Sequence, residues 1–472
     1  LRRAVRYGYT FLGFKEAFLY QLLPVLAEQF AEVFPEIKSQ FDFIQKAIQE
    51  EEKAFLRTLE NGLKLFEQIK SETKGDTIDG KVVFKLYDTF GFPLDLTELI
   101  ARENKLKIDL KGFEAAMAIQ KSSSRKAAQS EKSDWISVLE GGESEFVGYE
   151  QQEATVKILR YRQVSEKKHT FYQIVLDKTP FYAEAGGQVG DTGVLQFSRS
   201  DKSIKIIDTK KENDLSIHIS NQKNFLELIE EIKANNTQLL ASINLKKRSL
   251  TENNHSATHL LQKALQNVLG SHLAQKGSLV NDKGLRFDFS HFQKMTDEEI
   301  EAVEKEVNQA IRKNIPLKEL RNTPIQEAKD MGAMALFGEK YGDNVRVIVF
   351  DEEYSVELCG GTHVSATGNI GSFKIISETS IASGVRRIEA ITAEAAEAYS
   401  REESKTLQTV KTLLKNPKNV EKGIESLLQQ NAELNKQLET MQAEAAQSLK
   451  ADLLNELNAK GATNGINFLA KK

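Results

Sequence analysis

The chain has 472 residues, of which 40% are hydrophobic and 28% are charged, and its formal net charge is −4. This length predicts about three domains, and the composition is typical of a soluble globular protein with substantial cores. The near-neutral net charge gives no overall signature of nucleic-acid binding. The single cysteine excludes an internal disulfide framework, and no apolar run reaches the roughly 18 residues that are needed to span a membrane. We therefore expect a cytoplasmic protein.

The N-terminal 125 residues are predicted to be mostly helical. The opening LRRAVRYGYTFLGF begins with Leu rather than Met and carries the cations Arg2, Arg3 and Arg6, so we expect a segment cut from a longer protein. In EEEKAFLRTLENGLKLFEQI the apolar residues recur three or four positions apart, which is the spacing of one face of an amphipathic helix.

The pattern changes after this region. A further helix is expected to be capped by Asp95 or Thr97. The polar stretch 126–145 is poor in apolar anchors and is predicted to be a linker. From 146 to 245 the runs ATVKILRYRQV, HTFYQIVL, GVLQF and KSIKIIDTK are short and divided by polar or Gly turns, which predicts a small β-barrel or sandwich.

Two further regions complete the chain. Residues 246–394 mix helix-like and strand-like patterns, including a long helix from Asp297 to Lys313, and this mixed order indicates an α+β domain. Residues 395–472 have a helical composition with a break at Pro417, after which a heptad seam predicts either a short helical hairpin or a homo-oligomer contact. The seam consists of Leu427, Asn431, Leu434, Leu438, Met441 and Ala445.

Two pairs of residues with metal-ligand chemistry are each spaced four positions apart. His255 and His259 lie in a predicted helix, where this spacing places both imidazoles on one face. Cys359, the only cysteine, precedes His363 across two glycines, which is typical of a tight loop after a strand. Three imidazoles and one thiolate are a donor set that suits tetrahedral Zn²⁺, and chance spacing is the alternative.

The spacing alone leaves the role of this metal open. A metalloprotease helix carries Glu directly after its first His as the general base, and the residue at that position here is Ser256. Four protein ligands also close the coordination shell, so either the zinc is structural or one ligand gives way to water or substrate.

The segments around these pairs resemble one family closely. RRAVRYGY and KLYDTFGFPLDLT are similar to the helical tRNA-recognition region of alanyl-tRNA synthetases, whereas TPFYAEAGGQVGDTG, HSATHLLQKAL, LAQKGSLV, LRFDFSH, GAMALFGEKYG, ELCGGTHV and ASGVRRIEAIT are similar to their editing domain. Threonyl-tRNA synthetases and free-standing deacylases have related editing modules, but the helical N-terminal region favours the alanyl family. Two positions depart from the family pattern, because Gln262 stands where His is frequent and Ala393 stands where Gly is common.

The resemblance implies a multidomain α+β fold with the linker at 126–145. Its parts are a helical tRNA-recognition domain, a small β-barrel, a zinc-containing α+β editing domain, and a helical or coiled-coil connector with the truncated start of a further domain. These would occupy residues 1–125, 146–245, 246–394 and 395–472, respectively. The class II ATP-binding core would lie outside this sequence, so ATP and Mg²⁺ would act only there.

The resemblance also implies that this part of an alanine–tRNA ligase hydrolyses tRNA mischarged with serine or glycine. A pocket rejects an analogue that differs by one small group only about 10- to 200-fold, so a second site must destroy the errors. His255, His259, Cys359 and His363 would hold one zinc ion at that site. The expected pocket residues around it are Gly186, Gly187, Gln188, Gln275, Arg286, Asp288 and Thr362. An ordinary β-turn and a solvated strand are the structural alternatives for the glycine loop and for the strand residues.

The expected partner is the alanine tRNA, through its acceptor stem and mischarged 3′ end, with neither DNA nor a membrane involved. Five basic groups are suited to its phosphates, namely Arg2, Arg3, Arg6, Arg386 and Arg387. Asp88 is similar to the acidic residue that helps to read the family's G·U pair, since a carboxylate can accept from the guanine amino group; a helix cap is the alternative. The rival interpretation of the whole fragment is a tRNA-binding module with a purely structural zinc.

Overall fold

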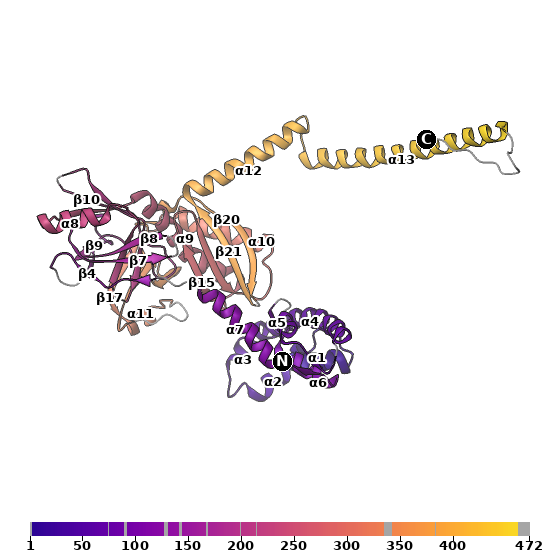
Figure 1. Cartoon of the computed structure of the whole chain (residues 1–472), viewed down its shortest axis with the longest axis horizontal. Helices are drawn as coiled ribbons and strands as arrows, with labels where there is room; N and C mark the ends of the chain where they lie inside the picture. The colour runs from indigo at the N-terminus through magenta and orange to yellow at the C-terminus, as the bar shows by residue number, and fades with distance from the viewer. Residues whose placement is uncertain are drawn as a thin grey trace. The chain divides into compact units, whose positions relative to one another are not determined.

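The computed structural model of the chain describes residues 2–73, 75–88, 92–126, 131–140, 144–166, 169–198, 200–213, 215–334, 342–382 and 384–460. It is a mixed α/β multidomain structure with a helical N-terminal region, β-rich and α+β regions, and two long C-terminal helices (Figure 1). The chain divides into two compact units, one up to Ala396 and one from Glu397 onward. No helix in these ranges is both long and apolar enough to cross a membrane. Most of the motif GAMALFGEKYG lies outside the described residues.

The N-terminal helices pack around one apolar core. Phe55, Leu59 and Phe66 of helix α4 (Phe41–Glu72) are buried in it, and Leu63 packs against it, as the spacing of three and four residues predicts. The other elements of this region are α1 (Arg2–Phe11), η1 (Leu19–Leu22), α2 (Leu23–Phe30), α3 (Glu36–Ser39), β1 (Thr77–Ile78), α5 (Gly80–Asp88), α6 (Leu94–Glu103), β2 (Lys107–Ile108) and α7 (Leu110–Lys126).

The cap expected for helix α6 is wrong. The helix begins at Leu94, its N-cap is Pro93 with φ −60°, and no side chain makes a cap hydrogen bond. Asp95 and Thr97 therefore lie inside the first turns, where the Thr97 hydroxyl donates to the carbonyl oxygen of Pro93 at 3.2 Å. The φ of proline already suits a helix start, so the helix begins before both polar side chains.

The β-rich region consists mainly of two open sheets. Its elements are β3 (Glu131–Lys132), β4 (Ile136–Ser137), β5 (Glu145–Phe146), β6 (Glu153–Val156), β7 (Ile158–Glu166), β8 (His169–Leu176), β9 (Lys178–Thr179), β10 (Gly193–Phe197), β11 (Ser203–Ile206), β12 (Asp208–Glu212), β13 (Leu215–Ser220), α8 (Phe225–Asn235) and β14 (Leu239–Ile243). One sheet has the order β11–β10–β14–β6, and the other has the order β12–β13–β8–β7–β3, with β4 also paired to β7. No sheet in the described ranges closes on itself, so the strand order does not confirm the predicted barrel.

Two continuous runs of sequence each contribute to both sheets. ATVKILRYRQV changes sheet at Lys157, between β6 and β7, and KSIKIIDTK changes sheet at Ile207, between β11 and β12. The Asp177 carboxylate accepts the Lys157 backbone N–H at 2.7 Å and so supports the first corner. Strands that switch sheets at such corners enclose a shared apolar core between two sheets. Strands β3 and β4, from the stretch predicted to be a linker, extend the second sheet.

The α+β region carries the two ligand pairs. Its elements are α9 (Leu245–Leu269), β15 (Gln275–Val280), β16 (Leu285–Ser290), α10 (Asp297–Arg312), β17 (Lys318–Pro324), α11 (Ile325–Asp330), β18 (Asn344–Phe350), β19 (Ser355–Leu358), η2 (Thr367–Ile370), β20 (Phe373–Ala382) and β21 (Val385–Thr392). An antiparallel sheet of order β15–β16–β21–β20 contacts α9 and α10, and a second sheet has the order β17–β18–β19. The predicted long helix is confirmed as α10, which Thr296 and Glu299 start with a capping box.

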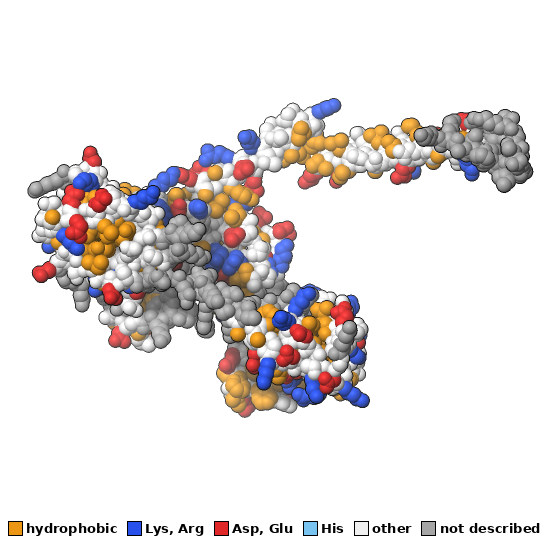
Figure 2. All heavy atoms as spheres, in the orientation of Figure 1, with side chains coloured by type: hydrophobic (Ala, Val, Ile, Leu, Met, Phe, Trp, Pro, Cys, Tyr) orange, Lys and Arg blue, Asp and Glu red, His pale blue; other side chains and the backbone are white. Residues whose placement is uncertain are grey.

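Two helices form the C-terminal part. They are α12 (Ala393–Leu413) and α13 (Val420–Lys460), and Pro417 lies in the break between them, as predicted. Leu427, Leu434, Leu438 and Met441 of the predicted seam are each more than half exposed on α13. Figure 2 shows hydrophobic side chains along this helix. The seam is therefore not buried in a hairpin within the described residues, and the oligomer contact stays a prediction.

Candidate metal centre

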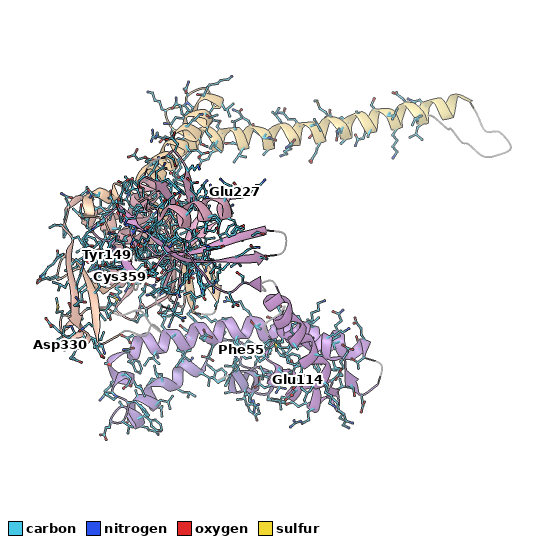
Figure 3. The ribbon with its side chains drawn as sticks, turned by 60° about the vertical axis from the view of Figure 1, so that its left-hand side comes forward. Phe55, Glu114, Tyr149, Glu227, Asp330 and Cys359 are labelled. Carbon is cyan, nitrogen blue, oxygen red and sulfur yellow. The ribbon has the colours of Figure 1, made fainter. Side chains whose placement is uncertain are left out.

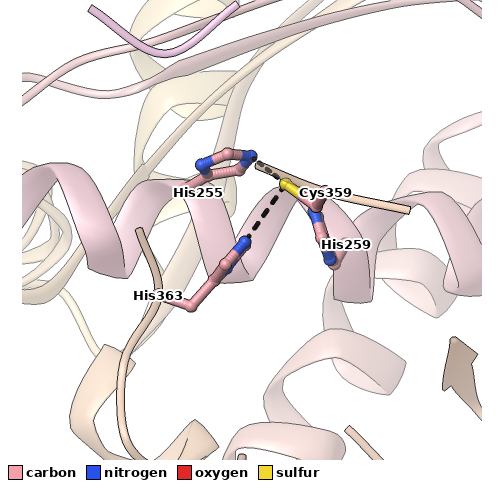
Figure 4. A group of neighbouring side chains, drawn as sticks. All are labelled: His255, His259, Cys359 and His363. Carbon is pink, nitrogen blue, oxygen red and sulfur yellow. Dashed lines mark hydrogen bonds between the residues drawn. The ribbon is translucent and has the colours of Figure 1, made fainter. Parts of the chain in front are cut away.

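The two ligand pairs meet at the middle of helix α9. His255 and His259 lie one turn apart on this helix, and both are buried. Cys359 and His363 lie on the loop that follows β19, as the two glycines between them predict. One ligand atom from each of the four residues falls within 4.8 Å of all the others. Figure 4 shows the four side chains converging.

The donor atoms are arranged as a metal would require. Nε2 of His255 is 3.5 Å from Cys359 Sγ, and Nε2 of His363 is 3.3 Å from the same sulfur (Figure 4). The Nδ1 atom of His259 is buried and has no hydrogen-bond partner in the described structure. A metal ion among the four residues accounts for the convergence of one donor atom from each. The residues present therefore fit a bound divalent ion.

Burial keeps the imidazoles in the neutral form that binds metals. Desolvation, with a smaller contribution from the Arg346 cation, lowers the pKa of His255 to about 3. Desolvation also lowers the pKa values of His259 and His363 well below the ordinary value. At pH 7 each ring therefore offers a lone pair without first losing a proton.

The loop that carries Cys359 is held from two sides. Arg346 on β18 donates to the carbonyl oxygens of Cys359 at 2.9 Å and Gly361 at 2.6 Å. The hydroxyl of Tyr149, from the β-rich region, donates to the carbonyl oxygen of Gly360 at 2.6 Å, and Figure 3 shows Tyr149 beside Cys359. A Cβ on Gly361 would lie 2.1 Å from the His255 ring, so only glycine permits this approach.

Sequence reasoning missed Arg346 and Tyr149. Arg346 had a usable signal, because it is the single charged side chain inside the strand run NVRVIVF. A lone cation within an otherwise apolar strand is buried only when it is paired, and Arg346 also donates from Nε to Glu319 at 2.6 Å. Tyr149 had no such signal, since its role depends on a contact with a residue 211 positions away.

The glycine loop is a β-turn, and it also reaches the metal centre. Gly186 and Gly187 have φ values of +56° and +83°, and the flanking Ala185 and Gln188 exchange two backbone hydrogen bonds. This is the geometry of a type I′ turn, which glycine adopts without strain. The turn lies against β15, since Gly187 accepts the Val280 N–H at 2.8 Å. Gln188 is thereby buried next to His255.

A cavity of about 170 Å³ adjoins the ligand cluster. His255, His259 and Cys359 line it together with Gly186 and Gln275. Four of the predicted pocket residues are thus brought to the centre, either as lining (Gly186, Gln275) or through the hydrogen bonds that join Gln188 to Thr362. Gly187 packs behind them against Ser278, where a Cβ would lie 2.3 Å from the serine hydroxyl.

A buried carboxyl also lines this cavity. Burial raises the pKa of Glu357 to about 8, so the group is mostly protonated at pH 7. Its Oε2 lies 3.6 Å from His259 Nε2. Sequence reasoning passed over Glu357, although it is the first residue of the motif ELCGGTHV.

Arg286 and Asp288 are not among the residues that line the cavity in the described structure. Asp288 instead accepts two hydrogen bonds from Arg387, at 2.7 and 2.8 Å, and lies 3.6 Å from Arg286. Arg386 is paired with Glu378 at 2.5 Å through two nitrogens. Ion pairs within β16 and between neighbouring strands thus account for these residues, and their roles in substrate or tRNA binding stay predictions.

The predicted tRNA-binding residues of the helical region differ in exposure. Arg6 is 4% exposed and forms an ion pair with Glu103, so its charge is directed inward. Arg3 is exposed and lies 3.3 Å from Asp95, and Arg2 is exposed beside the ring of Phe55. The Asp88 side chain, at the end of α5, lies outside the described residues.

Comparison with known protein families gives matches in two segments of the chain. A family model of the class II (A) tRNA synthetases matches residues 1–238, which is half of the chain. A model of the second additional domain of threonyl and alanyl tRNA synthetases matches residues 345–389, which include Cys359 and His363. The histidine pair of α9 lies between the two matched segments.

Curated relatives align along the whole chain. The alanine–tRNA ligase of Cytophaga hutchinsonii is 57% identical over 99% of this chain and 52% of that protein. The enzymes of Bacteroides thetaiotaomicron and Bacteroides fragilis are 53% and 52% identical over similar shares. The chain spans about half the length of the curated relatives it matches. With these matches over its full length, the chain belongs to the alanyl-tRNA synthetase family, within class II of the tRNA synthetases.

Proposed function

We propose that this chain is the tRNA-recognition and editing part of an alanine–tRNA ligase. In this proposal it hydrolyses the ester bond of tRNA mischarged with serine or glycine, at a site that contains one zinc ion held by His255, His259, Cys359 and His363. Attachment of alanine, with ATP and Mg²⁺, would belong to the parts of the relatives that this chain does not span. The proposed substrate is the alanine tRNA.

One observation carries the proposal, which is that the ligand cluster and a cavity share residues. The cavity of about 170 Å³ has room for a small aminoacyl group and is lined by His255, His259 and Cys359. A site of this size suits serine and glycine, whose rejection by one binding pocket is limited to about 10- to 200-fold. A purely structural zinc site would have no need of an adjoining cavity.

The chain's own groups can position an ester in this cavity. When bound, zinc would supply a Lewis acid that anchors or polarises a polar group of the substrate. Gly186 of the type I′ turn lines the cavity without a side chain, which leaves space for a substrate group at this wall. The Gln275 amide donates to Ser278 Oγ at 3.1 Å, and this bond orients its carbonyl oxygen to accept from an α-ammonium group or a water.

The test is deacylation of seryl-tRNA and alanyl-tRNA by this chain, with its zinc content measured on the same sample. We expect the chain to remove serine and spare alanine, and Cys359→Ala to lose both zinc and hydrolysis. The affinity for tRNA should change far less, because the arginines proposed to bind its phosphates are not zinc ligands. Arg3→Ala serves as the converse control, with weaker tRNA binding and unchanged hydrolysis at saturation.

The alternative is a tRNA-binding module with a structural zinc. Its support is the closed donor set, since four protein ligands fill a tetrahedral shell. Bound zinc without hydrolysis, and equal losses of tRNA affinity and activity in Cys359→Ala, would favour this alternative.

A further inference from the structure

Gln188 makes three hydrogen bonds beside the metal centre and is fully buried. Its Oε1 atom accepts the backbone N–H of Thr362 at 2.9 Å, and its Nε2 atom donates to the Thr362 hydroxyl at 2.9 Å. The same Oε1 atom lies 2.7 Å from Nδ1 of His255. The glutamine thus joins the β-rich region, the ligand loop and helix α9 at one point.

The Thr362 backbone N–H settles which atom of the Gln188 amide is oxygen. A backbone N–H can only donate, so the atom that faces it at 2.9 Å must be the carbonyl oxygen. That oxygen can only accept, and therefore the His255 nitrogen that meets it must carry the hydrogen. His255 is consequently held as the Nδ1–H tautomer.

The tautomer decides which nitrogen of His255 can bind a metal. With the hydrogen on Nδ1, the lone pair lies on Nε2, and Nε2 is the atom 3.5 Å from Cys359 Sγ. A second hydrogen bond on a ligand histidine orients the ring and raises its basicity, and its loss reduces metal affinity about 10- to 100-fold in comparable sites. From this geometry we infer that Gln188 is a positioning residue that fixes the His255 ring and tautomer for metal binding.

The inference also explains why the turn before Gln188 is built from glycines. The carbonyl oxygen of Gly187 accepts the Val280 N–H, and Gly187 packs on Ser278. This close approach brings the side chain of the next residue, Gln188, to helix α9. Gly361 must lack a Cβ because one would lie 2.8 Å from Gln188 Oε1 as well as against His255. Two glycine motifs far apart in sequence therefore serve the same hydrogen bond.

The inference rests on the metal site of the proposed function, and its test is zinc affinity rather than activity. Zn²⁺ binding to the full chain is measured by competition with a chelator for wild type, Gln188→Met, Gln188→Glu and Gln275→Met. We expect Gln188→Met to bind zinc about 10- to 100-fold more weakly. Gln188→Glu should bind as tightly as wild type or more tightly, because a carboxylate still accepts from Nδ1–H and from Thr362. Gln275→Met is a matched change on the cavity wall, at a residue whose described hydrogen bond goes to Ser278 and not to a zinc ligand, and it should leave the zinc affinity unchanged.

A second measurement reads the tautomer without metal. Long-range ¹H–¹⁵N spectra of the metal-free chain distinguish Nδ1–H from Nε2–H, and comparison with His255→Ala assigns the signal. Wild type should show Nδ1–H, and Gln188→Met should gain the Nε2–H form. Unchanged zinc affinity and unchanged tautomer in Gln188→Met would overturn the inference and leave the proposed function standing. Absence of zinc binding in wild type would overturn the proposed metal site and, with it, the metal-binding role of Gln188, whereas the tautomer measurement would still report on the Gln188–His255 hydrogen bond.

Discussion

Ala393 begins helix α12 with a φ of +48°, in the left-handed region that favours glycine. A Cβ in this region costs roughly 1–2 kcal/mol. We expect Ala393→Gly to raise the free energy of unfolding by about 0.5–1 kcal/mol, because relief of strain exceeds the added chain entropy. Chemical denaturation measures the change. Ala396→Gly, three residues further on in the regular helix, should lower the free energy of unfolding by about 1 kcal/mol. If both variants changed the free energy of unfolding in the same direction, strain at Ala393 would be contradicted.

His218 makes folding of the β-rich region sensitive to acid. Its Nε2 lies 2.7 Å from the Thr179 hydroxyl, its Nδ1 lies 3.1 Å from the Ile174 carbonyl oxygen, and burial lowers its pKa from 6.5 to about 4. Between these two values the unfolded chain binds a proton that the folded chain excludes, so stability falls as pH decreases through this window.

The expected loss of unfolding free energy from His218 is about 2 kcal/mol between pH 7 and pH 5. Chemical denaturation at both pH values should show this loss in the wild-type chain. In His218→Gln, the same comparison should give a smaller difference, even though the variant is less stable at pH 7. An equal pH dependence in both proteins would mean that other groups are responsible.

At the scale of elements, one buried ion pair attaches helix α9 to the β-rich region. Arg248 donates to both carboxylate oxygens of Asp191 and to the carbonyl oxygens of Gly148 and Pro180. Arg248 and Asp191 are 4% and 5% exposed, so solvent cannot replace either partner. The same helix carries His255 two turns further on.

Replacing one partner of this ion pair should lower the free energy of unfolding more than its position alone would, because the other partner is left buried without it. Arg248→Met leaves a buried, unpaired carboxylate, and we expect a loss of about 3–5 kcal/mol in unfolding free energy. The double variant Arg248→Met with Asp191→Asn should lose less than the sum of the two single variants, because neither charge of the pair is then left buried without the other. A double-mutant cycle by chemical denaturation measures the coupling, and strict additivity would argue against it.

The sequence predicted those helices and strands well that are determined by residues close together in the chain. The spacing of three and four residues identified α4, short runs divided by polar or Gly turns identified β7, β8 and β10, and the four-residue spacing identified both pairs of the His/Cys cluster. The predictions were less complete where distant contacts decide the structure. The sheet change at Lys157 depends on Asp177, and the start of α6 depends on the φ of Pro93 rather than on a polar cap.

The same distinction applies within the candidate site. Gln188 was predicted to approach the site, but its bonds to His255 and Thr362 join residues 67 and 174 positions apart. Arg386 and Arg387 were predicted to bind phosphates from their charge alone. Their pairing with Glu378 and Asp288 depends on strand register, which periodicity does not reveal.

At the scale of the whole molecule, the apolar seam on α13 predicts association. Leu434 and Leu438 are 63% and 54% exposed, although heptad positions of this kind are normally buried against a partner helix. We expect concentration-dependent self-association in sedimentation velocity, abolished by Leu434→Glu with Leu438→Glu. Ala432→Glu with Thr440→Glu adds the same charge on the outer face of the helix, away from the seam and its flanking positions, and should have no such effect. A wild-type chain that stays monomeric at all concentrations would contradict the prediction.

The distance between the two ligand pairs along the chain bears on how the protein is made. His255 and Cys359 are 104 positions apart, and ribosomes add about 5–20 residues per second, so the first pair waits on the order of 5–20 s for its partners. During that interval the β-rich region is already synthesised and can hold Gln188 against the nascent helix. The order of synthesis therefore allows the imidazole of His255 to be oriented before Cys359 and His363 are added to the chain.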